Sequence, residues 1–137
     1  MSAVVVDASL FVSALSPAET HHQAARRLLA EHPKEEPLRV PALFRLEVLS
    51  ALARRGRPAP LLETVDAIVN AAPFLTVPVS GELIERAVSV ARTAGLRAYD
   101  AIYVALALEI DATLWTLDRE IRSKSPLAFP DLRIAPV

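Results

Sequence analysis

Four acidic residues stand at places in this chain where a carboxylate could do chemistry. Asp7 directly follows the apolar run Val4-Val5-Val6, and Asp118 comes soon after the apolar stretch 112–116. Asp100 falls in the first turn of an expected helix, and Glu47 lies in a helix that is otherwise largely apolar. If the four meet, they need a cation, because two unit charges 4 Å apart repel by about 4 kcal/mol at an effective dielectric near 20.

Each of these acids also has an ordinary structural explanation. Asp7 and Asp118 are typical helix N-caps, and Asp100 suits the positive end of a helix dipole. Glu47 fits the polar edge of a buried helix. A shared site of these four acids, in contrast, would offer only oxygen ligands, because it contains neither cysteine nor histidine. Such a site indicates Mg²⁺ or Mn²⁺ rather than zinc, and it is suited to phosphodiester hydrolysis by a metal-activated water.

Short apolar runs alternate with helical patterns along the chain. Strands are expected near residues 4–6, 38–40, 74–77, 112–116 and 132–134. Helices are expected near 17–32 with Ser16 as N-cap, and near 42–55, 62–72, 81–95 and 96–107. This alternation predicts an α/β fold with a mainly parallel sheet. Ligands bind beyond the carboxyl ends of such strands, which is where Asp7 and Asp118 stand.

Composition limits the class of protein. The 137 residues, 53% hydrophobic and 23% charged, predict one domain over 1–137. The absence of cysteine, of a signal-peptide pattern and of a membrane-length apolar run predicts a cytoplasmic protein without membrane contact. A net charge of −1 does not mark a strongly basic nucleic-acid binder. The three glycines lie at or near helix ends, so no phosphate-cradling glycine loop is present.

The chain resembles the PIN-domain ribonucleases, and above all the VapC-type toxins of bacterial toxin–antitoxin modules. The resemblance covers nearly the whole chain and rests on the order and spacing of four motifs. These are Val5-Val6-Asp7-Ala8-Ser9, Glu47 in its helix, Thr116-Leu117-Asp118, and the most specific one, 98–107, which reads AYDAIYVALA.

This resemblance implies a three-layer PIN-like fold, with a parallel sheet flanked by helices. It implies that Asp7, Glu47, Asp100 and Asp118 are the catalytic and metal-binding acids, supported by the hydroxyls of Ser9 and Thr116. It further implies Mg²⁺-dependent (or Mn²⁺-dependent) endonucleolytic cleavage of RNA, a homodimer, and inhibition by a small antitoxin. The homodimer is also expected from the nearly all-apolar helix 42–55.

Several residues stay outside this scheme. The stretch 119–126 is more polar than the family pattern leads us to expect, and Glu120 and Asp131 are additional candidate ligands. His21 and His22 are expected on the solvent side of a helix, because no metal-binding histidine spacing exists. Trp115 is expected in the core. Tyr99 and Tyr103 lie four positions apart on one helix face, and packing in the core or in a dimer contact is expected for them rather than stacking on RNA.

Other functions compete with a toxin. A haloacid-dehalogenase-like phosphatase would need a second aspartate where Ser9 stands. A receiver domain would need an acidic pair after the first strand and a lysine after a late strand, and neither is present. A housekeeping PIN nuclease for RNA processing, and a metal-binding PIN module with little turnover, both fit the same residues.

Overall fold

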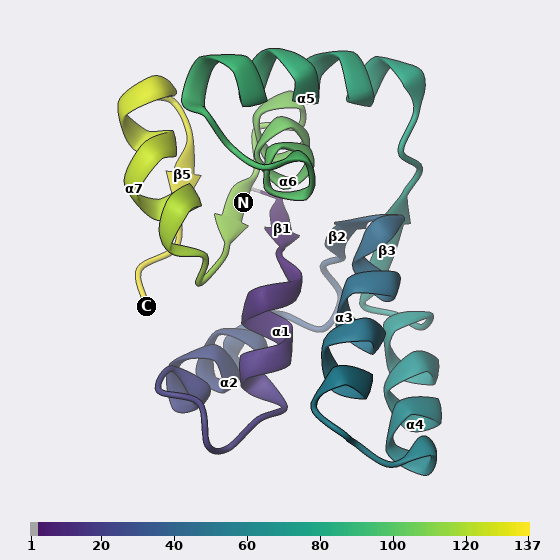
Figure 1. Cartoon of the computed structure of the whole chain (residues 1–137). Coiled ribbons are helices and arrows are strands. Elements are labelled where there is room, and N and C mark those ends of the chain that lie inside the picture. Colours follow the sequence, from purple (N-terminus) through teal and green to yellow (C-terminus); the bar gives the residue numbers. More distant parts are fainter. Residues whose placement is uncertain (1–2) are drawn as a thin grey trace.

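A parallel five-stranded sheet forms the centre of the computed structural model, which describes residues 3–137 (Figure 1). The strand order is β3-β2-β1-β4-β5, and every neighbouring pair is parallel. The elements in chain order are β1 (Val4–Val6), α1 (Ala8–Ala14), α2 (His22–Glu31), β2 (Leu38–Pro41), α3 (Leu43–Arg54), α4 (Ala59–Val69), β3 (Phe74–Val77), α5 (Gly81–Ala94), α6 (Ala98–Glu109), β4 (Thr113–Trp115), α7 (Arg119–Ala128) and β5 (Arg133–Ile134).

The chain reverses its direction of travel across the sheet at β1. From β1 it steps to β2 and then to β3, and it afterwards returns across the sheet to β4 and β5. Because crossovers between parallel strands are right-handed, the two series of connections lie on opposite faces of the sheet. Helices α1–α4 pack among themselves, as do α5–α7. The three-layer α/β architecture expected from the sequence is therefore confirmed.

The direction of the chain across the sheet changes between β1 and β4, and ligands bind at such a position in parallel sheets. Val5 and Val6 are fully buried and lie in register with Leu114 and Trp115. The segments that follow β1 and β4 run to opposite faces of the sheet, and this separation opens a crevice at the carboxyl ends of the two strands. Asp7 follows β1 there, and Thr116 and Asp118 follow β4.

Helix α6 packs directly against the sheet at β1, β2 and β4 (Figure 1). Its residues 101–107 are all buried, which explains why the sequence there is apolar on every side. Helix α5 lies across α6 and leaves Ile84 and Val88 exposed. Trp115 is buried, as expected. None of the helices formed by residues 3–137 is long and apolar enough to cross a membrane.

Two helix boundaries differ from those expected. Helix α2 begins at His22, so the helix start expected at Ser16 is wrong. Ser16 instead donates from Oγ to the Val12 carbonyl, 2.8 Å away, and so closes α1 rather than capping α2. Helix α4 begins at Ala59, three residues before the expected start, because Pro60 is compatible with a first helical turn.

The polar stretch after Asp118 forms a regular helix, α7. The Asp118 carboxylate caps it by accepting a hydrogen bond from the Ile121 amide, at 2.9 Å. Ile121 is fully buried, which attaches the helix to the core although its surface is polar. The unusually polar composition of residues 119–126 therefore does not prevent this segment from forming a helix.

Candidate active site

Asp7 is held at the end of β1 by hydroxyls from two different parts of the chain. Its side chain is buried, and its backbone amide extends the ladder to β4 by donating to the Trp115 carbonyl at 2.9 Å. Its Oδ2 accepts hydrogen bonds from Ser9 Oγ at 2.9 Å and from Thr116 Oγ1 at 2.5 Å. Burial raises the pKa of Asp7, and these hydrogen bonds oppose the increase.

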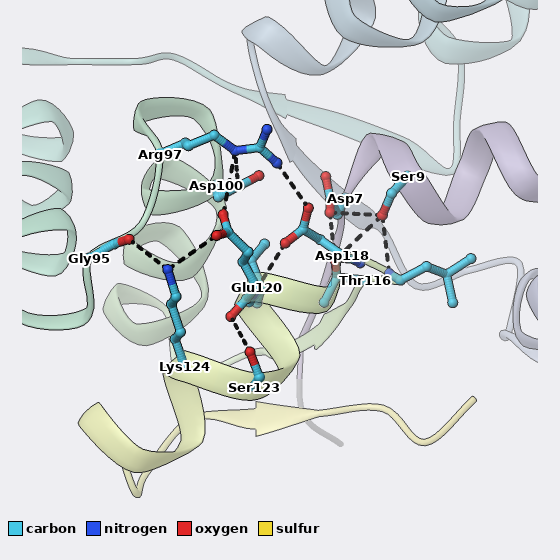
Figure 2. Close-up of polar contacts among 12 residues, drawn as sticks. Asp7, Ser9, Gly95, Arg97, Asp100, Thr116, Asp118, Glu120, Ser123 and Lys124 are labelled. Atoms are coloured by element: carbon cyan, nitrogen blue, oxygen red, sulfur yellow. Dashed lines mark hydrogen bonds and ion pairs between the residues drawn. The ribbon is translucent and has the colours of Figure 1, made fainter.

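The same hydroxyls also fix the backbone that follows β4. Ser9 Oγ accepts from the Leu117 amide at 3.1 Å, and Thr116 Oγ1 accepts from the Asp118 amide at 3.0 Å (Figure 2). Each hydroxyl thus contacts both Asp7 and the segment that carries Asp118. Ser9 and Thr116, the two hydroxyls named from the sequence, thus both hydrogen-bond to Asp7.

Glu47 approaches the site from α3 and is tied to α6. The Tyr103 hydroxyl donates to Glu47 Oε1 at 2.7 Å, and the Tyr103 ring is fully buried. Partial burial raises the pKa of Glu47 to about 7; the Tyr103 hydrogen bond lowers it, while Asp7 and Asp100 raise it further. A carboxyl group with this pKa takes up and loses a proton close to neutral pH.

Asp100 lies in the first turn of α6, with its side chain only 13% exposed. Partial burial raises its pKa to about 6, and the nearby Asp118 and Asp7 add to the increase. Arg97 opposes it, with Nε 3.3 Å from Asp100 Oδ2. Figure 2 shows the Arg97 guanidinium reaching from Asp100 toward Asp118, whose Oδ2 lies 3.5 Å from Nη2.

The four carboxylates line one cleft of about 330 Å³. Residues from α1, α3 and the loop before α6 complete its walls, among them Ser9, Ala51, Arg55, Arg97 and Leu117. An acid can cap a helix and also line the shared cleft. Asp118 does both, because it caps α7 and faces the cleft. All four sequence-predicted acids therefore line the same cleft.

The donor set suits a hard divalent cation by its chemistry, because carboxylate and hydroxyl oxygens are the groups such ions prefer. Within residues 3–137, however, no three acidic or histidine side chains lie close enough together to surround one ion. Arg97 lies against two of the carboxylates, Asp100 and Asp118. The cleft thus brings the acids together without closing them around a common point.

Glu120 and Asp131 do not join the four acids. Glu120 lies at the edge of the site, where it pairs with Arg97 at 3.6 Å and with Lys124 at 3.1 Å. Asp131 lines a separate cleft beside Asp111 and Arg133.

The expectation that His22 is solvated is wrong. His22 is buried, with Nδ1 2.8 Å from the Ser13 carbonyl oxygen, because α2 folds its first turn back against α1. Tyr103 packs in the core and is fully buried, whereas Tyr99 is 56% exposed.

Arg97 and Tyr103 are the site residues that sequence reasoning missed. Arg97 and Asp100 are three positions apart, and this spacing is a local signal that could have revealed their ion pair. No local signal exists for Tyr103 and Glu47, which stand 56 positions apart. Their contact follows from the packing of α3 and α6 on the sheet.

Comparison with known proteins assigns the family. The PIN domain model matches residues 4–125. The chain is 33% identical over 128 residues to Ribonuclease VapC3 of Pyrobaculum aerophilum, covering 90% of this chain and 95% of that protein.

Solved structures with the same fold include VapC20 of Mycobacterium tuberculosis, described as a toxin that cleaves the sarcin–ricin loop. It has a TM-score of 0.76 at 20% identity, over 96% of this chain and 99% of that one. A toxin–antitoxin complex from Klebsiella pneumoniae has a TM-score of 0.72 at 16% identity, over 98% and 97%. The acids at the end of β1 and β4 and the match over residues 4–125 place this chain in the PIN-domain family.

Proposed function

We propose that this protein is a divalent-metal-dependent endoribonuclease and the toxin of a toxin–antitoxin pair. The observation that carries the proposal is the convergence of four carboxylates on one cleft at the β1–β4 crevice. The ribonuclease VapC3, at 33% identity over most of both chains, supports RNA as the substrate. The cytoplasm is the proposed compartment.

Asp7, Asp100 and Asp118 are the proposed holders of Mg²⁺ or Mn²⁺, with Glu47 at the edge of the same cleft. Such an ion supplies an activated water and stabilises negative charge on a phosphodiester. The chain's own contribution is to fix Asp7 through Ser9 and Thr116, so that this carboxylate needs no reorganisation when the substrate binds. Glu47, with a pKa of about 7, is suited to accept a proton near neutral pH.

Arginines at the cleft suit an anionic substrate. Arg55 and Arg97 both line it, and guanidinium groups are well matched to phosphate oxygens. A second cleft of about 570 Å³ carries Arg119 and Arg122 and shares Ser13 and Leu117 with the first. This continuity supports a polynucleotide that extends beyond a single phosphate.

An RNA cleavage assay tests this function. Purified protein is incubated with total cellular RNA at low salt, with EDTA alone and after addition of Mg²⁺ or Mn²⁺. We expect cleavage only with the metal, loss of cleavage in Asp7→Asn and Asp100→Asn, and unchanged cleavage in the control Asp131→Asn. Metal-independent cleavage, or full activity in both site variants, would reject the proposal.

An antitoxin and a second copy of the chain are the proposed protein partners. Toxin–antitoxin complexes among the proteins of the same fold support the antitoxin. Leu46 on α3, 67% exposed and beside the partly buried Leu49 and Leu62, supports a dimer contact through α3 and α4. Sedimentation at micromolar concentration should show a dimer that Leu46→Glu dissociates, and a wild-type monomer would exclude this contact. Co-purification with the product of a neighbouring small gene tests the antitoxin.

A further inference from the structure

Arg97 is one of the two arginines that line the acidic cleft, and it contacts two of the four acids. Its guanidinium lies 3.3 Å from Asp100 Oδ2 and 3.5 Å from Asp118 Oδ2, and both carboxylates are mostly buried. The Arg97 side chain is 73% exposed, so it reaches into the cleft from the solvent side. It occupies the place between two of the proposed metal-binding carboxylates and partly neutralises them.

Arg97 also has a partner outside the four acids. Its Nε lies 3.6 Å from Glu120 Oε2 on α7. Glu120 is in turn held by Lys124 Nζ at 3.1 Å, and Lys124 donates to the Gly95 carbonyl at 3.3 Å (Figure 2). The guanidinium is therefore shared between the cleft and an anchored carboxylate at its rim.

The Asp118 oxygen that faces Arg97 is the one that does not cap α7. Its Oδ1 accepts from the Ile121 amide at the start of α7, while Oδ2 faces Arg97. A divalent ion held by Asp100 and Asp118 would lie close to the guanidinium, so the two cations would repel each other and each would weaken the binding of the other.

We propose that Arg97 is a built-in counter-cation that competes with the divalent metal for Asp100 and Asp118, and that Glu120 holds the guanidinium when the metal displaces it. The inference rests on the proposed metal-dependent function and concerns how tightly this chain binds the ion. It also accounts for carboxylates that share a cleft without closing around a common point.

Metal binding tests the competition without any activity measurement. The probe is Mn²⁺, whose free concentration is followed by electron paramagnetic resonance during titration of the protein. We expect Arg97→Gln to tighten Mn²⁺ binding by about three- to tenfold, because each exposed ion pair with Arg97 has a modest strength. Arg97→Lys, which keeps the charge but loses the planar fork, should give an intermediate affinity.

Arg86→Gln is the matched control. Arg86 also bridges two carboxylates, Glu82 and Glu109, and its side chain is 53% exposed. It lies on α5 and does not line the cleft. Its neutralisation should change the Mn²⁺ affinity by less than about twofold, since distant exposed charges are screened by salt.

Glu120→Gln tests the second half of the proposal. Without Glu120 the guanidinium rests more on the cleft acids, so Mn²⁺ binding should weaken in the wild-type background. In the Arg97→Gln background the same change should weaken binding by a smaller factor, because only the loss of a nearby negative charge remains. The difference between the two factors measures the coupling of Arg97 and Glu120 directly.

The outcomes separate this inference from the proposed function. If wild type binds Mn²⁺, Asp7→Asn does not, and Arg97→Gln leaves the affinity unchanged or weakens it, the competition is wrong and the metal site stands. An equal effect of Glu120→Gln in both backgrounds overturns the role of Glu120. If neither wild type nor Arg97→Gln binds Mn²⁺, the metal site and the competition both fail.

Discussion

The two halves of the acidic cleft are built differently. Asp7 stands at the end of the buried strand β1, and hydroxyls from α1 and from the residue after β4 donate to its carboxylate. Glu47 and Asp100 come from helices, are only partly buried, and are held by one tyrosine and one exposed arginine. The strand half is rigid because its backbone belongs to the sheet, whereas the helix half depends on individual side-chain contacts.

This difference suggests a division of labour. A metal site needs at least one ligand whose position does not depend on the ion, and Asp7 meets that need. The helix half can adjust its charge, because Glu47 and Asp100 have pKa values of about 7 and 6, and Arg97 lies between these acids and a further partner, Glu120. Substitutions on the strand half should therefore affect activity more than those on the helix half.

The largest effect is expected for Asp7→Asn. Losing the central carboxylate should reduce RNA cleavage by about a thousandfold, since metal-dependent stabilisation of the transition state is lost. Thermal stability should be unchanged or higher, because burial already disfavours the charged form of Asp7. Cleavage kinetics and a melting curve on the same preparation measure both. A strong decrease of the melting temperature would show that the negative charge itself holds β1 and β4 together.

Thr116→Val should have the next largest effect. The isosteric change removes a donor to Asp7 and an acceptor for the Asp118 amide, both at a fully buried position. We expect a loss of about 2 kcal/mol in the free energy of unfolding and about tenfold in cleavage rate. Denaturant unfolding and steady-state kinetics check these values. Unchanged stability would mean that Ser9 alone suffices to fix Asp7.

Tyr103→Phe examines the helix half and should act more weakly. Glu47 loses its only hydroxyl donor among the described residues but can still reach solvent, so the loss should be about 1 kcal/mol and a few-fold in rate. The pKa of Glu47 should rise further, because the hydrogen bond that lowers it is gone. The acidic limb of the rate–pH profile should accordingly move to higher pH. If the rate–pH profile does not change, the ionisation of Glu47 does not control the rate of cleavage.

The last prediction concerns stability alone, which should depend on pH. In the metal-free fold Glu47 and Asp100 have raised pKa values, so the folded state binds more protons than the unfolded state between about pH 4 and 7. The melting temperature in EDTA should therefore fall as pH rises through this range. Mg²⁺ should restore it at pH 7.5 and have less effect at pH 5. A melting temperature that rises with pH in EDTA would contradict the clustering of the acids.

Sequence patterns predicted most of the fold because they report local physics. The strand at Val4-Val5-Val6 and the helix near 81–95 depend on patterns that act over a few residues, and both form as expected. The start of α2 was mispredicted because Ser16 bonds back to α1 and also accepts from Arg55, which stands 39 positions away. A capping pattern cannot reveal such a tertiary competitor.

In the site, too, the features set by local sequence could be predicted and those set by tertiary contacts could not. Asp7 and Asp118 could be placed together because strand order brings the ends of β1 and β4 side by side. The role of Tyr103 depends on how deeply α6 is buried, and that of Arg97 depends on where α7 presents Glu120. These contacts are set by packing between distant elements, and the polar composition of 119–126 concealed the helix that supplies one of them.

The position of the bound ion decides whether the β1–β4 crevice is a metal site. Crystals of the protein grown with Mn²⁺ would show this position through anomalous scattering. We expect a peak in the cleft in contact with Asp7 and at least one of Asp100 and Asp118, with Arg97 turned toward Glu120. A peak that contacts none of these acids, or none at saturating Mn²⁺, would contradict a metal-dependent site at the β1–β4 crevice.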